Sequence, residues 1–205
     1  MRSRSTNTPE MDTPSKCGEN DGTSHEQPKT RISTNWYVIT GGPSSGKTSV
    51  VNELKARGYN TMVEDARHYI DLQRAKGKSV EEIESNRRVF QRKVLDLQIA
   101  QEKSLSPDDL VFLDRAIPDT RAYCQFLRIP EDKKLTDIMK TVSYRKIFIL
   151  GLLPLVKDYA RREDEAAQIA IHQLIIGVYQ GLGFPIMFVP VLPIGERVDL
   201  ILANL

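Results

Sequence analysis

The sequence has few cysteines, no long apolar run and almost no net charge. Of its 205 residues only Cys17 and Cys124 are cysteines, and neither stands at a metal-ligand spacing, so we expect no disulfide framework and no zinc site. No apolar run approaches the roughly 20 residues of a membrane-spanning helix, and MRSRSTNTPE is not followed by the apolar core of a signal peptide. The net charge of +2 is too small for a nucleic-acid-binding surface. These absences predict a cytoplasmic protein with no membrane span and no nucleic-acid partner.

The first 34 residues differ in composition from the rest of the chain. They are rich in Ser, Thr, Asn, Pro and Glu, and their apolar side chains are Met1, Met11, Cys17 and Ile32. So few apolar groups cannot offset the entropy lost when a chain becomes ordered. We therefore expect a disordered tail over residues 1–34, followed by one globular domain over residues 35–205.

A glycine-rich turn after an apolar strand is the strongest motif. GGPSSGKT, which begins at Gly41, satisfies G-x-x-x-x-G-K-[ST] between a strand-like and a helix-like segment, so the second domain is predicted to be a P-loop domain. The backbone N–H groups of such a loop and the positive end of the next helix form an anion site. We expect Lys47 to reach the β- and γ-phosphates of ATP and Thr48 to bind Mg²⁺. The predicted nucleotide-binding residues are Gly41, Gly42, Pro43, Ser44, Ser45, Gly46, Lys47, Thr48 and Ser49.

Strand-like runs alternate with helix-length segments after the tail. The expected strands are near-continuous apolar runs, typical of a parallel sheet that is buried on both faces, and they are residues 36–40, 60–64, 110–114, 146–150 and 186–191. One helix is expected to follow Ser79, which forms a capping box with Glu82, and others to occupy residues 165–182 and the C-terminus. The predicted fold is a three-layer α/β P-loop NTPase fold with a five-stranded parallel sheet, which binds ligands beyond the carboxyl ends of its strands.

Charged residues follow two of the expected strands at that edge. Glu64 and Asp65 end the second strand, and Asp114 and Arg115 end the third. A carboxylate after four apolar strand residues matches the acidic position that faces Mg²⁺ in P-loop proteins, so Asp114 is predicted as a second metal ligand. Arg115 stands where ATPases that activate water commonly carry Glu.

The ordered set of motifs resembles a known family. VITGGPSSGKTS, VEDAR, VFLDRAIPDT, YARRED and VPVLPIGERV are similar to a small P-loop family grouped as AAA-type ATPase domains, and the layout also resembles nucleoside and nucleotide kinases. The resemblance implies a kinase-like fold with Glu64 as the catalytic base. It also implies that Asp114 and Arg115 act on Mg²⁺, sugar or phosphate. Asp65 beside Glu64 leaves the identity of the base open.

The segment KDYARREDEAA follows the fourth expected strand and opens a helix. In P-loop kinases an arginine-bearing lid occupies this place, so the resemblance implies that Arg161 stabilises charge on the transferred phosphoryl group. The same charges would also suit a solvated helix start with pairs along its surface. Arg162 is interpreted as such a surface residue.

Three further residues of reactive type are interpreted as packing or surface positions. His68 and His172 have no second ligand at metal spacing, and Cys124 stands in an apolar context. The sequence therefore gives them no role in the chemistry.

Two functions fit these residues. The first is a Mg²⁺- and ATP-dependent phosphotransferase acting on a small nucleoside- or nucleotide-like acceptor; the second is an ATPase or a nucleotide-dependent regulatory module that binds a protein or lipid partner. The sequence has no N-K-x-D motif, which argues against a standard GTPase, and it has Asp-Arg where an AAA-type motor would have Asp-Glu. Both absences favour the phosphotransferase. The acceptor stays open, as does the choice between monomer and homodimer.

Overall fold

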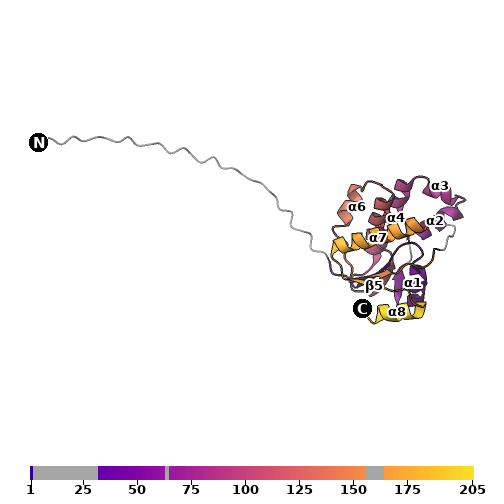
Figure 1. The fold of residues 1–205 in the computed structure, drawn as a ribbon. Helices are drawn as coiled ribbons and strands as arrows, with labels where there is room; N and C mark the ends of the chain where they lie inside the picture. The colour runs from indigo at the N-terminus through magenta and orange to yellow at the C-terminus, as the bar shows by residue number, and fades with distance from the viewer. Residues whose placement is uncertain (2–31, 63–64, 156–163) are drawn as a thin grey trace.

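The computed structural model describes residue 1 and residues 32–62, 65–155 and 164–205 (Figure 1). The elements, in chain order, are β1 (Trp36–Thr40), α1 (Lys47–Ala56), β2 (Asn60–Met62), α2 (Asp65–Ala75), α3 (Val80–Glu84), α4 (Arg87–Ser104), β3 (Val111–Asp114), α5 (Ile117–Phe126), α6 (Lys133–Ile138), β4 (Lys146–Leu150), α7 (Glu165–Leu182), β5 (Ile186–Val189) and α8 (Ile194–Leu202).

The strands form one five-stranded parallel sheet in the order β2-β3-β1-β4-β5. The first strand in the chain is therefore the central one, and every residue of β1 is buried. Its residue Ile39 lies opposite Asp114 of β3, and Thr40 lies opposite Ile149 of β4. This sheet confirms the predicted fold class. Parallel strands end at a common edge, and the loop after β1 leaves the sheet between the ends of β3 and β4.

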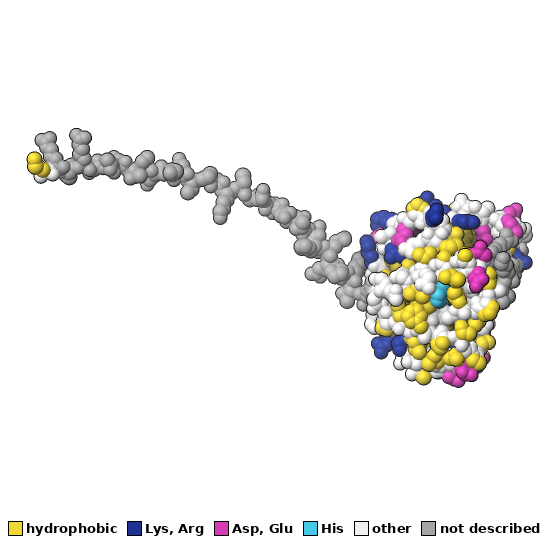
Figure 2. Space-filling model, viewed as in Figure 1, with side chains coloured by type: hydrophobic (Ala, Val, Ile, Leu, Met, Phe, Trp, Pro, Cys, Tyr) yellow, Lys and Arg dark blue, Asp and Glu magenta, His cyan; other side chains and the backbone are white. Residues whose placement is uncertain are grey.

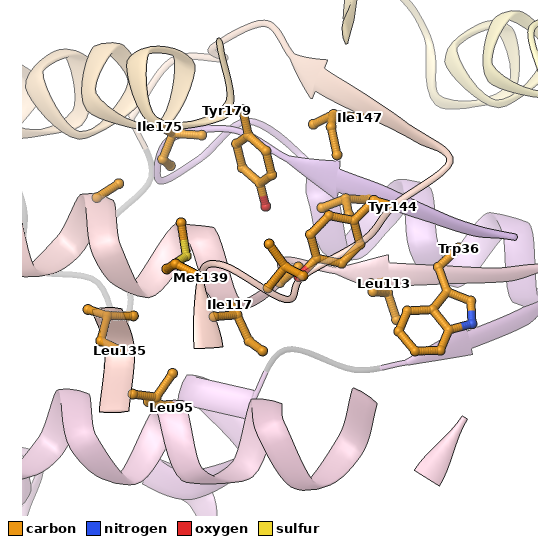
Figure 3. Close-up of a cluster of buried hydrophobic side chains, with 14 of the residues drawn as sticks. Trp36, Leu95, Leu113, Ile117, Leu135, Met139, Tyr144, Ile147, Ile175 and Tyr179 are labelled. Atoms are coloured by element: carbon orange, nitrogen blue, oxygen red, sulfur yellow. The ribbon is translucent and has the colours of Figure 1, made fainter. Parts of the chain in front are cut away.

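Helices cover both faces of the sheet and produce the predicted three layers (Figure 1). On one face, α4, α5 and α7 bury residues such as Leu95, Ile117 and Ile175 against Leu113 and Ile147 of the strands, as Figure 3 shows. On the other face α1 and α8 pack on the opposite side chains of the same strands, and the helix residues involved are Val50, Val51, Leu54, Val198 and Ile201. The sheet is apolar on both sides because each side has its own helical layer.

The expected helix after Ser79 is two helices. The predicted capping box is confirmed, since Glu82 N donates to Ser79 Oγ at 3.2 Å and Ser79 N donates to Glu82 Oε2 at 2.9 Å. That helix, α3, ends at Glu84, and Asn86 starts α4 by accepting from Val89 N at 3.1 Å. Asparagine competes for backbone donors in this way, so it ends one helix and caps the next. The break lets α2 and α3 fold over the start of α4 around a small cluster of Ile70, Val80, Ile83, Phe90 and Val94.

Thr34, the last residue of the expected tail, is buried against the folded domain. Its hydroxyl donates to Ser143 O at 2.7 Å, and Asn35 N donates to Pro107 O at 2.7 Å. Most of the expected tail, residues 2–31, lies outside the described residues. Within the part of the chain that the structure describes, no helix has the length and apolarity needed to cross a membrane.

Candidate nucleotide-binding site

The loop between β1 and α1 has a backbone that its glycines make possible. Gly41 has φ 143° and Gly46 has φ 83°. A Cβ on Gly41 would stand 2.8 Å from Leu150 O, so no side chain fits there. Gly46 is the N-cap of α1, and no side chain caps the helix through it. The N–H groups at the start of α1, with the helix dipole, form a site for an anion.

The lysine of the motif lies inside this loop. Lys47 is buried, and its Nζ donates to Gly41 O at 3.0 Å, to Gly42 O at 2.8 Å and to Ser45 Oγ at 3.2 Å. An ammonium group placed among carbonyl oxygens can turn to a stronger, charged acceptor when one arrives. This geometry is suited to holding a phosphate at the end of α1.

The two residues predicted to bind Mg²⁺ lie side by side. Thr48, in the first turn of α1, donates its hydroxyl to Asp114 Oδ2 at 3.2 Å. Asp114 is buried at the end of β3. A hydroxyl and a carboxylate oxygen are ligands that Mg²⁺ accepts, and this ion keeps several waters or phosphate oxygens as its other ligands. The donor set therefore fits Mg²⁺, although the assignment stays a prediction.

Arg115 contacts two side chains of α5. Its side chain runs along α5, where Nη1 donates to Asp119 Oδ1 at 3.3 Å and Nη2 donates to Tyr123 OH at 3.1 Å. Its φ is 71°, a left-handed conformation that is strained in a residue with a Cβ. Such strain gathers at functional sites, and the predicted role of Arg115 at the phosphate stays a prediction.

Asp119, which the sequence did not single out, joins the end of β1 to the turn after β3 and to α7. Its Oδ1 accepts from Thr40 Oγ1 at 2.5 Å, and its Oδ2 accepts from Ala116 N at 3.1 Å and from Tyr179 OH at 2.6 Å. Burial, together with the charge of Asp119, raises the pKa of Tyr179 well above its ordinary value. The carboxylate thus fixes the last residue of β1, the turn after β3 and α7 in one network. The only sequence signal for it is Pro-Asp at the start of α5.

Two side chains of α7 hold the loop from outside the motif. Gln168 is buried and donates its Nε2 to Pro43 O at 2.9 Å and to Leu153 O at 3.0 Å. One turn later, His172 Nδ1 accepts from Gly42 N at 3.1 Å. Burial, and then the charge of Lys47, lower the pKa of His172. The interpretation of His172 as a packing residue missed this contact with the phosphate loop.

A third support comes from α8 on the other face of the sheet. Arg197 is 1% exposed, and its Nη1 donates to Ser45 O at 2.8 Å. Burial lowers the pKa of its guanidinium. The side chain lies against Gly46, where a Cβ would stand 3.2 Å from Nη1. Arg197 belongs to the string GERV that carried part of the resemblance, yet its role was not predicted.

The other predicted residues separate into two groups. Pro43, Ser44 and Ser45 are buried in the loop, and Ser49 is exposed on the first turn of α1. Glu64 and Arg161, the predicted base and lid arginine, lie outside the described residues, as does Arg162. Asp65, the alternative base, begins α2.

The fold and the loop define a P-loop protein of the class that binds nucleoside triphosphates. A family described as AAA domain matches residues 36–197, and the chain belongs to this family. The predicted resemblance is thereby confirmed. A search of the curated proteins finds no match to this sequence.

Solved structures share the fold, and two of them are structures of kinases. Deoxyadenosine kinase from M. mycoides with bound dATP is 15% identical over 82% of this chain and 98% of its own, with a TM-score of 0.56. Thymidylate kinase from Ehrlichia chaffeensis is 13% identical over 84% of this chain and 98% of its own, with a TM-score of 0.58. NadR protein in complex with NAD and AMP-PNP is 17% identical over 82% of this chain and 48% of its own, with a TM-score of 0.56. At these identities the similarity shows the fold alone.

Proposed function

We propose that this protein is a Mg²⁺- and ATP-dependent phosphotransferase whose acceptor is a small nucleoside- or nucleotide-like molecule. The observation that carries the proposal is the Thr48–Asp114 pair beside the uncapped start of α1, with Lys47 buried in the same loop. The similarity in fold to proteins named deoxyadenosine kinase and thymidylate kinase supports the choice of acceptor class.

The chain's own groups account for phosphate binding. The N–H groups of the loop and of the first turn of α1 would bind the β-phosphate, and Lys47 would exchange the carbonyls of Gly41 and Gly42 for phosphate oxygens. Thr48 and Asp114 would hold Mg²⁺, which, when bound, neutralises charge on the phosphates. The buried position of Lys47 and Asp114 limits water around the reacting phosphate.

The acceptor is expected on the side of β2. Met62, the last residue of β2, lies opposite Leu113, which immediately precedes Asp114. Glu64 follows Met62 by two residues, and this supports its proposed role as the base that takes the proton of an acceptor hydroxyl. Arg161 is proposed to stabilise the charge of the moving phosphoryl group.

An ATPase or regulatory module that binds a protein or lipid partner is the alternative, and one observation favours it. Phe188, Val191 and Ile194 are 54%, 56% and 48% exposed at the end of β5 and the start of α8. Figure 2 shows hydrophobic side chains across the face in view, which includes the region where Figure 1 places β5 and α8. Exposed apolar groups in one region are a common sign of a contact surface.

The test is ADP formation from ATP and Mg²⁺ in the presence of a panel of nucleosides and nucleotides. The phosphotransferase requires that one acceptor stimulates ADP formation and appears as a phosphorylated product. Lys47→Ala is the control, because it removes the phosphate contact. ADP formation at a rate that no acceptor changes would instead support the alternative.

We also propose that the P-loop domain does not need the residues before its first packed side chain. Thr34 is the first buried residue in the described part of the chain, and a deletion of residues 2–31 keeps it. We therefore expect this deletion to leave the described packing intact. ATP affinity and melting temperature should match those of the full chain, as measured by calorimetry and thermal unfolding. A clearly lower melting temperature would show that these residues contribute to the fold.

A further inference from the structure

The peptide unit between Gly41 and Gly42 is held at both ends. Its carbonyl, Gly41 O, accepts from Lys47 Nζ at 3.0 Å. Its amide, Gly42 N, donates to His172 Nδ1 at 3.1 Å. The imidazole, the peptide and the ammonium group thus form one chain of hydrogen bonds that runs from α7 to the phosphate site.

The backbone donor in this chain of hydrogen bonds defines the protonation state of His172. A backbone N–H can only donate, so Nδ1 carries no hydrogen and the ring is neutral, with its hydrogen on Nε2. Burial and the charge of Lys47 lower the pKa of this side chain, which agrees with the neutral ring. Of the charged residues on α5, which packs against α7, Asp119 pairs with Arg115 and Arg121 pairs with Glu131. The segment 151–155 on the other side of the loop contains no ionisable residue.

The peptide needs such an anchor because glycines flank it. Gly41, at φ 143°, lies in a region that only glycine enters readily, so few steric barriers oppose a rotation of the next peptide. A rotation would turn Gly41 O away from Lys47. Gly42 also packs directly on α7, since a Cβ there would stand 3.0 Å from His172 Cβ and from Gln168 O. The helix therefore contacts the loop at the residue whose amide His172 binds.

We infer that His172 is a positioning residue, which fixes the Gly41–Gly42 peptide from α7 and thereby fixes the resting place of the Lys47 ammonium group in the phosphate site. The inference rests on triphosphate binding, as the proposed function does, but it requires no acceptor and no transfer. His172 acts through the loop backbone and makes no contact with the nucleotide in this scheme. Protonation of the ring would remove the acceptor for Gly42 N, so the positioning effect persists below the ordinary histidine pKa and is lost as pH falls through the lowered pKa of His172.

Binding measurements on three substitutions test this. His172→Asn is the informative change, because the Oδ1 of the new side chain can stand near the position of Nδ1, accepts a hydrogen bond and does not titrate. His172→Ala removes the acceptor. His68→Asn is the matched control, since His68 is exposed on α2 and is the other histidine of the described residues. Affinities for the non-hydrolysable triphosphate AMP-PNP with Mg²⁺, and for adenosine, are measured by calorimetry.

At about pH 8, above the ordinary histidine pKa, His172→Ala should weaken AMP-PNP binding by about tenfold and leave adenosine binding within about twofold. His172→Asn should stay within about threefold of the wild type for both ligands. In a pH series below 8, the wild type should lose AMP-PNP affinity relative to His172→Asn as pH falls through the lowered pKa of His172. Because both proteins bind the same ligand, the ratio of their affinities cancels the titration of the phosphates. His68→Asn should follow the wild type throughout the pH series.

Different results would contradict the proposed role of His172 in different ways. If His172→Asn binds as weakly as His172→Ala, or if the wild type gains affinity over His172→Asn at low pH, His172 is not a neutral positioning group. Equal losses for AMP-PNP and adenosine, with a lower melting temperature, would show a structural role only. If His172→Ala does not fold, the pH series with His172→Asn still decides. If Lys47→Ala weakens AMP-PNP binding and no substitution of His172 does, the inference fails while the nucleotide site stands.

Discussion

The phosphate loop has an inner and an outer set of residues, and the two differ in what they contact. The inner set, Lys47, Thr48 and Asp114, presents charged or hydroxyl groups to the place where the phosphates would bind. The outer set is Asp119, Gln168, His172 and Arg197, whose side chains bind the backbone of the loop or the residues that flank it.

Because of this difference, we expect substitutions in the two sets to have different effects. A change in the inner set should alter ligand binding with little effect on folding, because these groups serve a ligand that the free protein lacks. A change in the outer set should alter the stability of the fold or the placement of the loop. The four predictions below test this separation, and the first has the largest expected effect.

Asp119→Asn should lower the free energy of unfolding by about 3 kcal/mol, since it leaves buried donors without a charged acceptor. Thr40, Ala116 and Tyr179 all donate to this carboxylate, and an amide NH₂ would face at least one of them. Denaturant unfolding measures the loss. Asp137→Asn, at an exposed ion pair with Lys133, is the control and should change stability by less than about 1 kcal/mol. A small effect at Asp119 would show that the network does not support the loop.

Lys47→Ala should weaken ATP binding by about 100-fold, equivalent to about 2.7 kcal/mol, and leave adenosine binding nearly unchanged. Only the triphosphate uses the ammonium charge, which now rests on loop carbonyls. Isothermal calorimetry with both ligands gives the comparison. Lys55→Ala, at an exposed position later in α1, is the matched control. Equal losses for ATP and adenosine would mean that Lys47 belongs with the outer set.

Asp114→Asn should remove most of the tightening that Mg²⁺ gives to ATP binding, roughly tenfold. The substitution keeps the size of the side chain and its oxygen acceptor for Thr48, so binding without Mg²⁺ should persist. The ratio of ATP dissociation constants with Mg²⁺ and with a chelator measures the effect. An unchanged ratio would place the metal ligand elsewhere.

Substitution by glycine should change stability in opposite directions at two arginines with positive φ. Arg128, at φ 55°, is exposed just after α5, and Arg128→Gly should raise the free energy of unfolding by about 0.5 to 1 kcal/mol because glycine relieves the strain. Arg115→Gly relieves a similar strain but breaks the buried pair with Asp119, so it should lower stability by about 2 kcal/mol. Thermal and denaturant unfolding of both variants measure the sign of each change in the free energy of unfolding. A gain in stability for Arg115→Gly would show that the ion pair with Asp119 contributes little to the stability of the fold.

The inner set could be predicted from the sequence because its members are adjacent or follow a strand. Lys47 and Thr48 belong to a contiguous motif, and Asp114 ends an apolar run, so local pattern and strand order were sufficient. The five-stranded sheet and its layers followed from similar runs. The helix that breaks at Asn86 was expected to be continuous, because its apolar spacing continues past the cap.

Three members of the outer set could not be predicted because their partners are backbone atoms far away in the chain. His172 binds an amide 130 residues before it, Gln168 a carbonyl 125 residues before it, and Arg197 a carbonyl 152 residues before it. A backbone group is the same in every residue, so the sequence near Gly42 or Ser45 carries no mark of its partner. Only the sheet order brings α7 and α8 to the loop.

The central position of β1 also affects how the protein is made on the ribosome. Of the five strands of the sheet this one is synthesised first, yet Thr40 pairs beside Ile149, and at 5–20 residues per second β4 appears roughly 5 to 20 s later. During that time the apolar WYVIT segment has at least one edge without its partner strand, the condition in which chains aggregate. Arg197 joins the loop later still, so the loop gains this contact only after α8 has been synthesised. Bound nucleotide would thus act as a stabiliser of the finished fold and not as a guide during synthesis.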